Sequence, residues 1–389
     1  MEPMLRFKAD DGSEFPKWEE KRLDEVVEFL DGLRKPLEAG ERVAGPYPYY
    51  GASGIIDYVE NYIFDDELIL LSEDGANIID RNYRVAFLAK GKYWVNNHAH
   101  VLKAVDSNVD YFICEQLESF DYRKYNSGGA QPKLNQATCR SIIMRMPCIE
   151  EQRKIADCLS SVDDIITATQ SELLAWQERK KGVMQKIFNR EVRFKADDGS
   201  EFPEWEEKRL GELGEFIGGG TPSTKVKEYW KGTIPWISSS DVFENDIQQL
   251  SVSRFITEEA IEKSATKRIP ENSICIVCRV GVGKVVIAPF ELCTSQDFVS
   301  ITALKDDICF LGYAMWNLMQ RKISDVRGTS IKGIPVKDLR EYMIDVPSLP
   351  EQRKIADCLS SLDDVINQIK AELSAWKEFK KGLLQQMFV

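Results

Sequence analysis

The chain has 389 residues, of which 43% are apolar, and a formal net charge of −12. This length allows two or more domains with separate cores, and the apolar content predicts a folded rather than a disordered protein. No run of about 18 apolar residues is present and the first residues lack an apolar stretch, so neither a membrane span nor secretion is expected. Nine cysteines at scattered positions form no disulfide framework, which favours a reducing cytoplasm.

A leader segment near the start of the chain returns in its middle. The sequence RFKADDGSEFPKWEEKRL at 6–23 recurs as RFKADDGSEFPEWEEKRL at 193–210 with one difference. Each copy contains a Glu-x-Lys pattern, Glu19–Lys21 and Glu206–Lys208, similar to that of nuclease cores. No suitably placed metal-binding aspartate precedes either pattern, so we interpret both as charged surface turns. The leaders therefore mark the beginnings of two units.

Two unlike bodies follow the leaders, at 24–147 and 211–347. Residues 311–324 predict a helix. Segments rich in β-branched, aromatic and other apolar residues, bounded by turn residues, predict strands at 66–75, 84–89, 92–97, 273–281 and 284–289. Both bodies are therefore expected to be mixed α/β.

A shared tail follows each body. The eleven letters EQRKIADCLSS at 151–161 return unchanged at 351–361. Large or apolar residues recur at alternating steps of 4 and 3 through 151–188 and 351–388, which is typical of a coiled-coil helix. At 1.5 Å per residue each helix would be roughly 57 Å long. The positions expected to pair the helices are Ile155, Leu159, Ile166, Leu173, Trp176, Ile355, Leu359, Ile366, Leu373 and Trp376.

Two arrangements of these helices are open. We expect them to pair antiparallel and to hold the bodies apart, because such a stripe is not stable facing water alone. The alternative is that each helix packs on its own body. The first leader has no tail before it, so Met387–Val389 is expected near the N-terminal segment, closing a ring.

The predicted fold class is therefore mixed α/β, with two globular domains separated by two long antiparallel coiled-coil helices in a circular, pseudo-two-fold arrangement. The expected segments are a first domain at 1–148, a first spacer helix at 149–190, a second domain at 191–348 and a second spacer helix at 349–389.

Patterns that would indicate catalysis are weak. Gly281, Gly283 and Lys284 in RVGVGKVVI miss the spacing of a phosphate-binding loop, and FIGGGTPSTK lacks the context of a dinucleotide site. His98 and His100 are the only histidines, which leaves little basis for a His-based triad or a multi-histidine metal site.

One cysteine pair superficially suggests zinc. Cys275 and Cys278 lie in SICIVCRVG, which reads as a buried strand that would point the two thiols to opposite faces. A structural zinc site needs four converging ligands, and no second close pair follows. We therefore expect no metal, no cofactor and no catalytic residue in this chain.

Polar loops in both bodies carry candidate DNA-contacting groups. Asn and Gln can pair bidentately with adenine in the major groove, and Lys or Arg with guanine. Screening makes local charge matter more than net charge, and residues 81–145 carry 10 basic against 5 acidic side chains. Simple solvated surface is the alternative interpretation. The candidate residues are Tyr49, Tyr50, Ser53, Asn97, His98, Ser127, Gly128, Gln131, Lys133, Asn135, Thr221, Ser223, Thr224, Ser238, Arg279, Lys284, Arg327, Thr329, Ser330 and Lys332.

These segments together resemble the specificity subunit of type I DNA restriction-modification systems. The resemblance rests on EEQRKIADCLSSVDD, PEQRKIADCLSSLDD, YPYYGASGIIDYV, GGGTPSTKVKEYWKGTIPWISSSDV and SGGAQPKLNQ, and it spans nearly the whole chain. It implies that each variable body is a target recognition domain reading one half of a bipartite, asymmetric sequence in double-stranded DNA.

The same resemblance implies the partners and location of the chain. The repeated helices would act as a spacer and dock two adenine-methyltransferase subunits, and ATP-dependent restriction subunits would join the full complex. Methyl transfer and cleavage would belong to those partners, so this chain would be a non-catalytic, cytoplasmic protein of a prokaryote. The alternatives from other classes are a protein-binding scaffold that bridges two partner copies and a self-contained nuclease, which the missing sites disfavour.

Overall fold

The computed structural model describes residues 3–106, 108–129, 131–325 and 333–388. The chain divides into two compact units, and each unit combines one body with parts of both long helices. Unit 1 comprises Met1–Ser171 and Ala371–Val389, and unit 2 comprises Glu172–Lys370. The C-terminal residues of the chain therefore belong to the unit that contains its N-terminal body.

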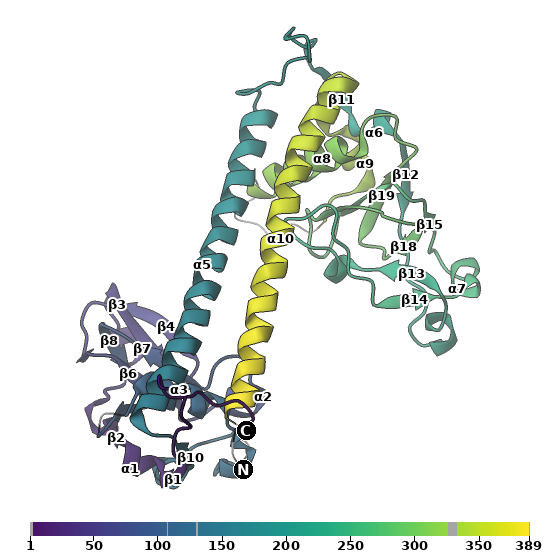
Figure 1. Cartoon of the computed structure of the whole chain (residues 1–389). Helices are drawn as coiled ribbons and strands as arrows, with labels where there is room; N and C mark the ends of the chain where they lie inside the picture. Colours follow the sequence, from purple (N-terminus) through teal and green to yellow (C-terminus); the bar gives the residue numbers. More distant parts are fainter. Residues whose placement is uncertain (1–2, 107, 130, 326–332, 389) are drawn as a thin grey trace. The chain divides into compact units, whose positions relative to one another are not determined.

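Unit 1 contains ten strands among its described residues, and most of its helices are short. The strands are β1 Glu19–Arg22, β2 Val27–Phe29, β3 Ala44–Gly51, β4 Gly54–Val59, β5 Phe64–Asp65, β6 Leu68–Ser72, β7 Ala86–Ala89, β8 Lys92–Val95, β9 Ala99–Ala104 and β10 Ile143–Met146. The helices of the body are α1 Leu23–Val26, α2 Asn77–Asp80, α3 Asp110–Ser119 and α4 Gln136–Arg140, and helix α5 begins after β10 and spans Ile149–Phe188 (Figure 1).

The strands of unit 1 form three sheets. Two have four strands, in the orders β2-β9-β6-β7 and β4-β3-β8-β5, and the third pairs β1 with β10. All five residues of the central strand β6 are buried, as expected for a continuous apolar run covered on both faces. The segments predicted as strands at 66–75, 84–89 and 92–97 contain β6, β7 and β8.

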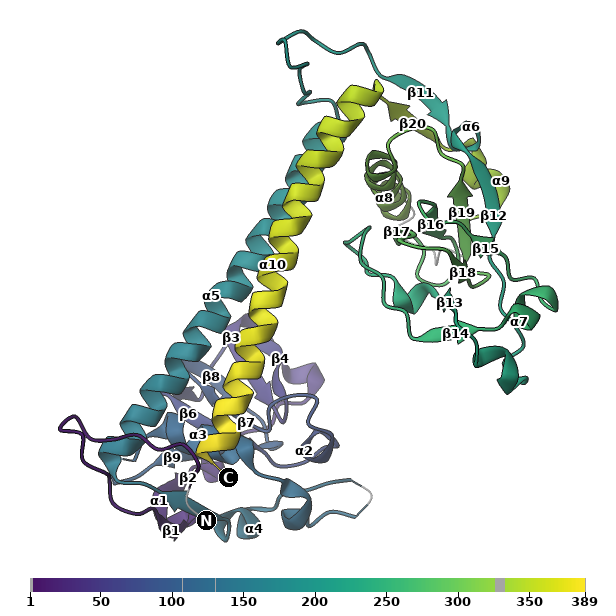
Figure 2. The ribbon, with the colours of Figure 1, turned by 45° about the vertical axis from the view of Figure 1, so that its right-hand side comes forward.

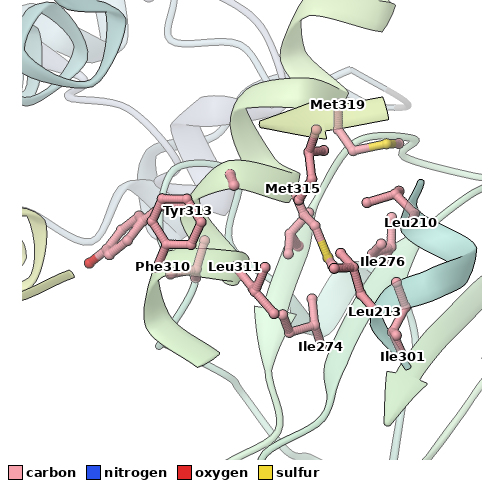
Figure 3. Close-up of a cluster of buried hydrophobic side chains, with 14 of the residues drawn as sticks. Leu210, Leu213, Ile274, Ile276, Ile301, Phe310, Leu311, Tyr313, Met315 and Met319 are labelled. Carbon is pink, nitrogen blue, oxygen red and sulfur yellow. The ribbon is translucent and has the colours of Figure 1, made fainter. Parts of the chain in front are cut away.

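Unit 2 has the corresponding set of elements. Its strands are β11 Glu206–Arg209, β12 Glu215–Gly218, β13 Ile234–Ile237, β14 Arg254–Ile256, β15 Arg268–Ile269, β16 Ile274–Val277, β17 Val285–Ile287, β18 Leu292–Thr294, β19 Phe298–Thr302 and β20 Met343–Val346. Its body helices are α6 Leu210–Leu213, α7 Glu258–Glu262, α8 Ile308–Asp325 and α9 Val336–Glu341, and α10 spans Leu349–Met387. In its core, Leu210 and Leu213 of α6 meet Ile276 of β16 and Met315 of α8 (Figure 3).

The two bodies share one topology although their sequences differ. Unit 2 has four-stranded sheets in the orders β12-β19-β16-β17 and β14-β13-β18-β15, and β11 pairs with β20. In each unit the second of these sheets contains one parallel pair, β3 with β8 and β13 with β18. The order of strands therefore corresponds one to one, which the sequence did not reveal beyond a mixed α/β class.

The Glu-x-Lys segments of the leaders form strands rather than the charged surface turns predicted for them. Residues 19–22 are β1, all exposed, and they pair antiparallel with β10 immediately before the first tail. Residues 206–209 are β11 and pair in the same way with β20 before the second tail. Successive side chains of such a strand point to opposite faces. Each charged leader segment is therefore one strand of a two-stranded sheet, and its partner strand leads into a long helix.

The start of each long helix is part of a body core. Ile155 and Leu159 are buried in the main cluster of unit 1, which also contains Met387 from the end of α10. Ile355 and Leu359 are buried in the main cluster of unit 2. The alternative that a helix packs on its own body therefore holds for the first turns of both helices.

The later seam positions are less uniformly buried. Ile366 and Leu373 are buried, whereas Ile166, Leu173, Trp176 and Trp376 are partly exposed. Pairing of the two helices is visible within each unit as an ion pair. Lys380 lies 2.7 Å from Asp163 in unit 1, and Lys180 lies 2.5 Å from Asp363 in unit 2.

The two ends of the chain lie side by side in unit 1. The Leu5 N–H donates to the Gln386 carbonyl at 3.1 Å, and the N and C labels are close in both ribbon views (Figure 2). This confirms the expected proximity for the described end of the chain, while Val389 lies outside the described residues. The equivalent bond in unit 2 joins Val192 N–H to the Lys186 carbonyl at 3.3 Å within one continuous segment.

Candidate nucleic-acid interface

A hydrogen-bonded loop at 126–134 presents several candidate residues of the first body. The Asn126 side chain accepts the N–H groups of Gly128 and Lys133, each at 2.9 Å, and the Ser127 N–H donates to the Lys133 carbonyl. A Cβ on Gly128 would lie 2.0 Å from the Gln131 carbonyl oxygen, so this close approach requires glycine. These bonds therefore join the two described arms of the loop, 126–129 and 131–134, and Ser127, Gln131 and Lys133 are exposed.

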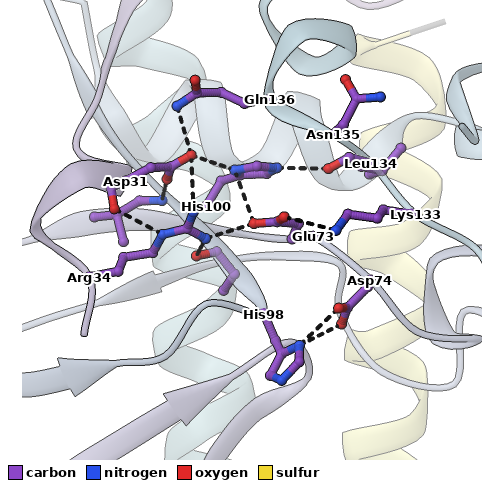
Figure 4. A network of polar contacts seen from close by, with 12 residues as sticks. Asp31, Arg34, Glu73, Asp74, His98, His100, Lys133, Leu134, Asn135 and Gln136 are labelled. Atoms are coloured by element: carbon purple, nitrogen blue, oxygen red, sulfur yellow. Dashed lines mark hydrogen bonds and ion pairs between the residues drawn. The ribbon is translucent and has the colours of Figure 1, made fainter. Parts of the chain in front are cut away.

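A network of largely buried charged side chains contacts this loop (Figure 4). His100 is 1% exposed, and its ring nitrogens contact the Asp31 carboxylate at 2.7 Å and the Leu134 carbonyl at 2.8 Å. Both partners are acceptors, so both nitrogens carry hydrogen and the ring is an imidazolium. Burial favours the neutral ring, but the hydrogen bond and charge of Asp31 outweigh it and raise the pKa of His100 to about 10.

Further charges complete the network. Arg34 donates to Glu73 at 2.8 Å, and the Lys133 ammonium lies 3.4 Å from the same carboxylate. Leu134 N–H donates to the Glu73 carbonyl at 2.7 Å, which ties the end of the loop to the end of β6. His98, half exposed, contacts Asp74 at 2.8 Å. The network thus fixes the positions of the exposed Lys133 and His98.

The remaining candidates of the first body separate into interior and surface positions. Tyr49 is 1% exposed and its hydroxyl accepts the Leu37 N–H at 2.9 Å, so its ring has no free face for a base. Asn135 caps α4 by accepting the Thr138 N–H. Ser53 and Asn97 are exposed at turns, and Tyr50 is partly buried.

The segment at 47–54 also differs from its predicted conformation. Tyr49 and Tyr50 are assigned above to a polar loop, but β3 runs through Ala44–Gly51, and only residues 52–53 connect it to β4. Side chains alternate between the faces of a strand, which explains why Tyr49 is interior while Tyr50 is not.

Arg254 is the best-positioned polar group of the second body. Its guanidinium lies 4.6 Å above the Trp236 ring and donates to Asp241 and Ser238, each at 2.5 Å. Together with Thr224, Lys227 and Trp230 it lines a cavity of about 330 Å³. The carboxylate and the aromatic ring hold the guanidinium in one orientation, as a group that reads a base or phosphate must be held.

The other candidates of the second body differ in availability. Ser223, Thr224 and Arg279 are exposed, and Thr221 donates to Gln296. Lys284 is partly buried and donates to the Ser239 and Val242 carbonyls at 3.2 and 3.0 Å, which uses its ammonium to join two loops. The candidates Arg327, Thr329, Ser330 and Lys332 lie outside the described residues.

Several residues of this surface carry no recognisable signal in the sequence. Arg254 and Asp241 stand in polar stretches without a distinguishing pattern. The acidic partners of His100, Asp31 and Glu73, and the Arg34 that pairs with both of them are distant from His100 in the sequence. Their grouping depends on the sheet order. The one available signal was the composition of residues 81–145, which did not indicate the acidic partners.

The paired cysteines separate as the strand interpretation requires. Cys275 is buried in a small cluster with Val286 and Phe298, whereas Cys278 is buried in the main cluster of unit 2. Burial raises the pKa of both thiols, to about 11 and about 12. Across the part of the chain that the structure describes, no group of three or more His, Cys, Asp or Glu side chains is arranged to hold a metal ion.

The long helices are amphipathic rather than uniformly apolar. Within residues 3–106, 108–129, 131–325 and 333–388, no helix combines the length and apolar character needed to cross a bilayer.

Two like-folded α/β bodies, each joined to a long helix and each carrying its own polar loops, define a duplicated recognition architecture. The family model described as the type I restriction modification DNA specificity domain matches this chain twice, at residues 16–175 and 203–375. The chain therefore belongs to the type I restriction-modification DNA specificity family. It is a specificity subunit of the kind expected from the sequence, non-catalytic, with catalysis in other subunits.

Named relatives agree with this assignment. The chain is 27% identical over 373 residues to a putative type I restriction enzyme specificity subunit of Haemophilus influenzae, which covers 92% of this chain and 90% of the relative. It is 31% identical over 240 residues to the EcoR124I/EcoR124II specificity subunit of Escherichia coli, covering 58% and 56%.

A solved structure shares the fold of the whole chain. The S subunit of the type I restriction-modification system from M. genitalium superposes with a TM-score of 0.64, covering 100% of this chain and 99% of that one at 16% identity.

Proposed function

We propose that each body reads one half of a bipartite, asymmetric sequence in double-stranded DNA. The observation that carries this proposal is that one strand topology presents different polar groups in the two bodies. The first has the loop supported by His100, and the second has Arg254 held by Asp241. A shared scaffold with unlike surface groups suits two readers of unlike sequences, because groove contacts specify bases while the scaffold only positions them.

The proposed contact residues are the exposed and partly exposed members of these surfaces. In the first body they are Ser53, Asn97, His98, Ser127, Gln131 and Lys133, with Tyr50, Gly128 and Asn135 in supporting positions. In the second body they are Thr221, Ser223, Thr224, Ser238 and Arg279, to which we add Arg254. The interior position of Tyr49 and the bonds of Lys284 favour structural roles for those two.

We further propose that the long helices form an antiparallel coiled coil that sets the distance between the half-sites. The ion pairs support this register, because a step of 17 residues along α5, from Asp163 to Lys180, matches an equal step back along α10, from Lys380 to Asp363. The equivalent backbone bonds at Leu5 and Val192 support a pseudo-two-fold, circular arrangement. The boundaries proposed are 1–148, 149–190, 191–348 and 349–389.

Membership of the family supports a proposal for the partners of this chain. Two adenine-methyltransferase subunits would dock on the duplicated frame, and restriction subunits would complete the assembly in the cytoplasm. A related solved chain, with a TM-score of 0.55, comes from work on complex assembly of the type I R-M system. A protein-binding scaffold without DNA recognition remains the alternative function.

A body exchange tests the proposal. A hybrid with residues 211–347 from another family member, assayed by methylome sequencing in cells with the cognate methyltransferase, should change one half-site and leave the other intact. Alteration of both half-sites would refute independent reading. A steep loss of affinity for mixed duplex DNA with rising salt would favour DNA binding over the scaffold alternative.

A further inference from the structure

Each unit contains a cavity at its long helices, away from the polar loops described above. In unit 2 a cavity of about 690 Å³ lies where the last turns of α5 meet α8 and α10. In unit 1 a cavity of about 510 Å³ lies where the last turns of α10 meet α3 and α5. The two cavities therefore occupy corresponding places in two separately folded units.

The residues that line the cavities also correspond. On the long helices they match at a constant offset of 200 positions, pairing Lys180 with Lys380, Lys181 with Lys381 and Gln185 with Gln385. The bodies, which differ in sequence, contribute basic side chains of their own.

On the body side, Arg321 lines the cavity of unit 2, and Arg81 and Arg84 line that of unit 1. Four basic side chains face one acidic side chain in the first case, and five face one in the second. Arg81 and Arg84 pair with Glu118 and Glu115, and Lys370 lies 3.7 Å from Asp246, so acidic side chains of the protein compensate these three charges.

The innermost lysines and the rim lysines differ in their partners. Lys180 and Lys380 are buried against Asp363 and Asp163, so their charges are largely compensated. Lys181 is 60% exposed and Lys381 is 65% exposed, and each lies 3.7 to 3.8 Å from a glutamate one turn earlier on its own helix. Exposed pairs of this kind contribute little, so the rim lysines are available to an incoming anion.

Apolar side chains form the remaining wall of each cavity. Met184 and Ile366 line the one in unit 2, and Leu384 and Ile166 line the one in unit 1. A duplex backbone offers phosphates but no apolar side chain to fill such a wall. A polypeptide segment with both acidic and apolar residues matches the wall and the rim together.

We propose that these two cavities are equivalent docking sites for an acidic, amphipathic segment of one partner protein, bound in two copies. This rests on the proposed function, in which two adenine-methyltransferase subunits bind the duplicated frame, and it identifies where and by what chemistry they bind. The corresponding lining residues in the two units suit two copies of one ligand. The polar loops of the two bodies differ and would not bind one ligand in the same way.

Charge reversal at the rim tests the proposal with the full chain and its cognate methyltransferase subunit. The variants are K181E, K381E and the double variant K181E/K381E, with complex composition measured by native mass spectrometry and affinity by calorimetry. Each single variant should weaken one of two sites by about tenfold, leaving one tightly bound copy, and the double variant should weaken both.

A matched control is K8E/K195E, since these leader lysines are duplicated, 63% and 62% exposed, and paired with glutamates outside both cavities. It should bind two copies normally. Melting temperatures identify variants that do not fold. If a charge-reversal variant does not fold, K181A or K381A replaces it.

Two outcomes would overturn the inference, and a third would contradict the proposed function on which it rests. Two copies bound with unchanged affinity by K181E/K381E would show that the cavities do not dock the partner. Unchanged partner binding with weaker, sequence-independent affinity for mixed duplex DNA would assign the cavities to phosphate. Failure of the unaltered chain to bind any methyltransferase subunit would instead contradict the proposed function, and is seen without any variant.

Discussion

Arg6 and Glu151, 145 positions apart in the sequence, form a buried ion pair that joins the first leader to the first tail. The guanidinium donates to the carboxylate at 2.7 and 3.1 Å, and the Glu151 side chain is 0% exposed. Arg193 and Glu351 repeat the arrangement in unit 2 at 2.9 and 3.2 Å. The leader and the tail are therefore repeated together because they contact each other.

Removing the cation of this pair should destabilise unit 1. R6A leaves a buried carboxylate without its main partner, and we expect the free energy of unfolding to fall by about 3 kcal/mol. Urea denaturation of the full chain, with circular dichroism and tryptophan fluorescence, measures the loss. R22A is the control, because Arg22 pairs with Asp24 at the surface and should cost only about 0.5 kcal/mol. Adding E151Q to R6A should recover part of the loss, and no recovery would argue against an orphaned charge.

Stability of the first body should depend on pH through His100. Its folded pKa of about 10 exceeds the ordinary histidine pKa of 6.5, so the folded state holds the proton more tightly. The stabilisation is fully present below about pH 6.5 and is lost as pH rises toward 10. The difference in melting temperature between the unaltered chain and H100Q should be largest at pH 6 and shrink at alkaline pH. A constant difference would mean that the ring does not titrate with folding.

Coupled insertions in the helices should lengthen the unread gap of the DNA site. One heptad inserted after Ser171 and one after Ala371 preserves both Lys–Asp pairs and adds about 10 Å. At about 3.4 Å per base pair the gap should grow by about three base pairs, with both half-sites unchanged. Methylome sequencing measures it. An insertion in α5 alone is the control, since it forces one ion pair out of register, and a normal gap with the coupled insertions would exclude the helices as a ruler.

Arg254 should determine one half-site. R254A removes a guanidinium group that Asp241 and Trp236 hold in place. We expect the free-energy difference between the correct and a substituted base pair at one position to fall by about 1 to 3 kcal/mol. R254K keeps the charge but not the planar, bidentate guanidinium. It should therefore restore nonspecific affinity for DNA without restoring discrimination between base pairs. Binding to duplexes with single substitutions in each half-site measures both effects. K231A in the same body, where Lys231 pairs with Glu228 at the surface, should change neither.

The long helices could be predicted from sequence because a step of 4 and 3 is a local signal, and α5 and α10 match it within two residues at either end. The structure also shows what most residues of the repeated EQRK sequence contact. Gln152 bonds the Pro147 carbonyl and Asn108, and Lys154 contacts Asp10 of the leader. The contacts of Glu151 and Lys154 with leader residues more than 100 positions away could not be predicted, because they depend on where the leader strand packs.

The recognition surfaces were less predictable for a related reason. Polar loops such as 126–134 could be found by composition. Tyr49 and Lys284 lie in segments of similar composition, but their side chains form hydrogen bonds within the protein. Arg254 was missed because its partners Ser238 and Trp236 come from the adjacent strand segment. Whether a polar side chain faces solvent or a neighbouring loop is decided by strand pairing, which a single sequence does not specify.

The division of the chain has a consequence for synthesis on the ribosome. Unit 2 is one uninterrupted stretch, whereas the core of unit 1 includes Met387, and Phe388 packs on Phe112 at 5.4 Å. The body that is translated first therefore cannot complete its core until every residue of the other unit has been synthesised. A premature stop codon near residue 380 would impair the N-terminal body and spare the one beside it in the gene.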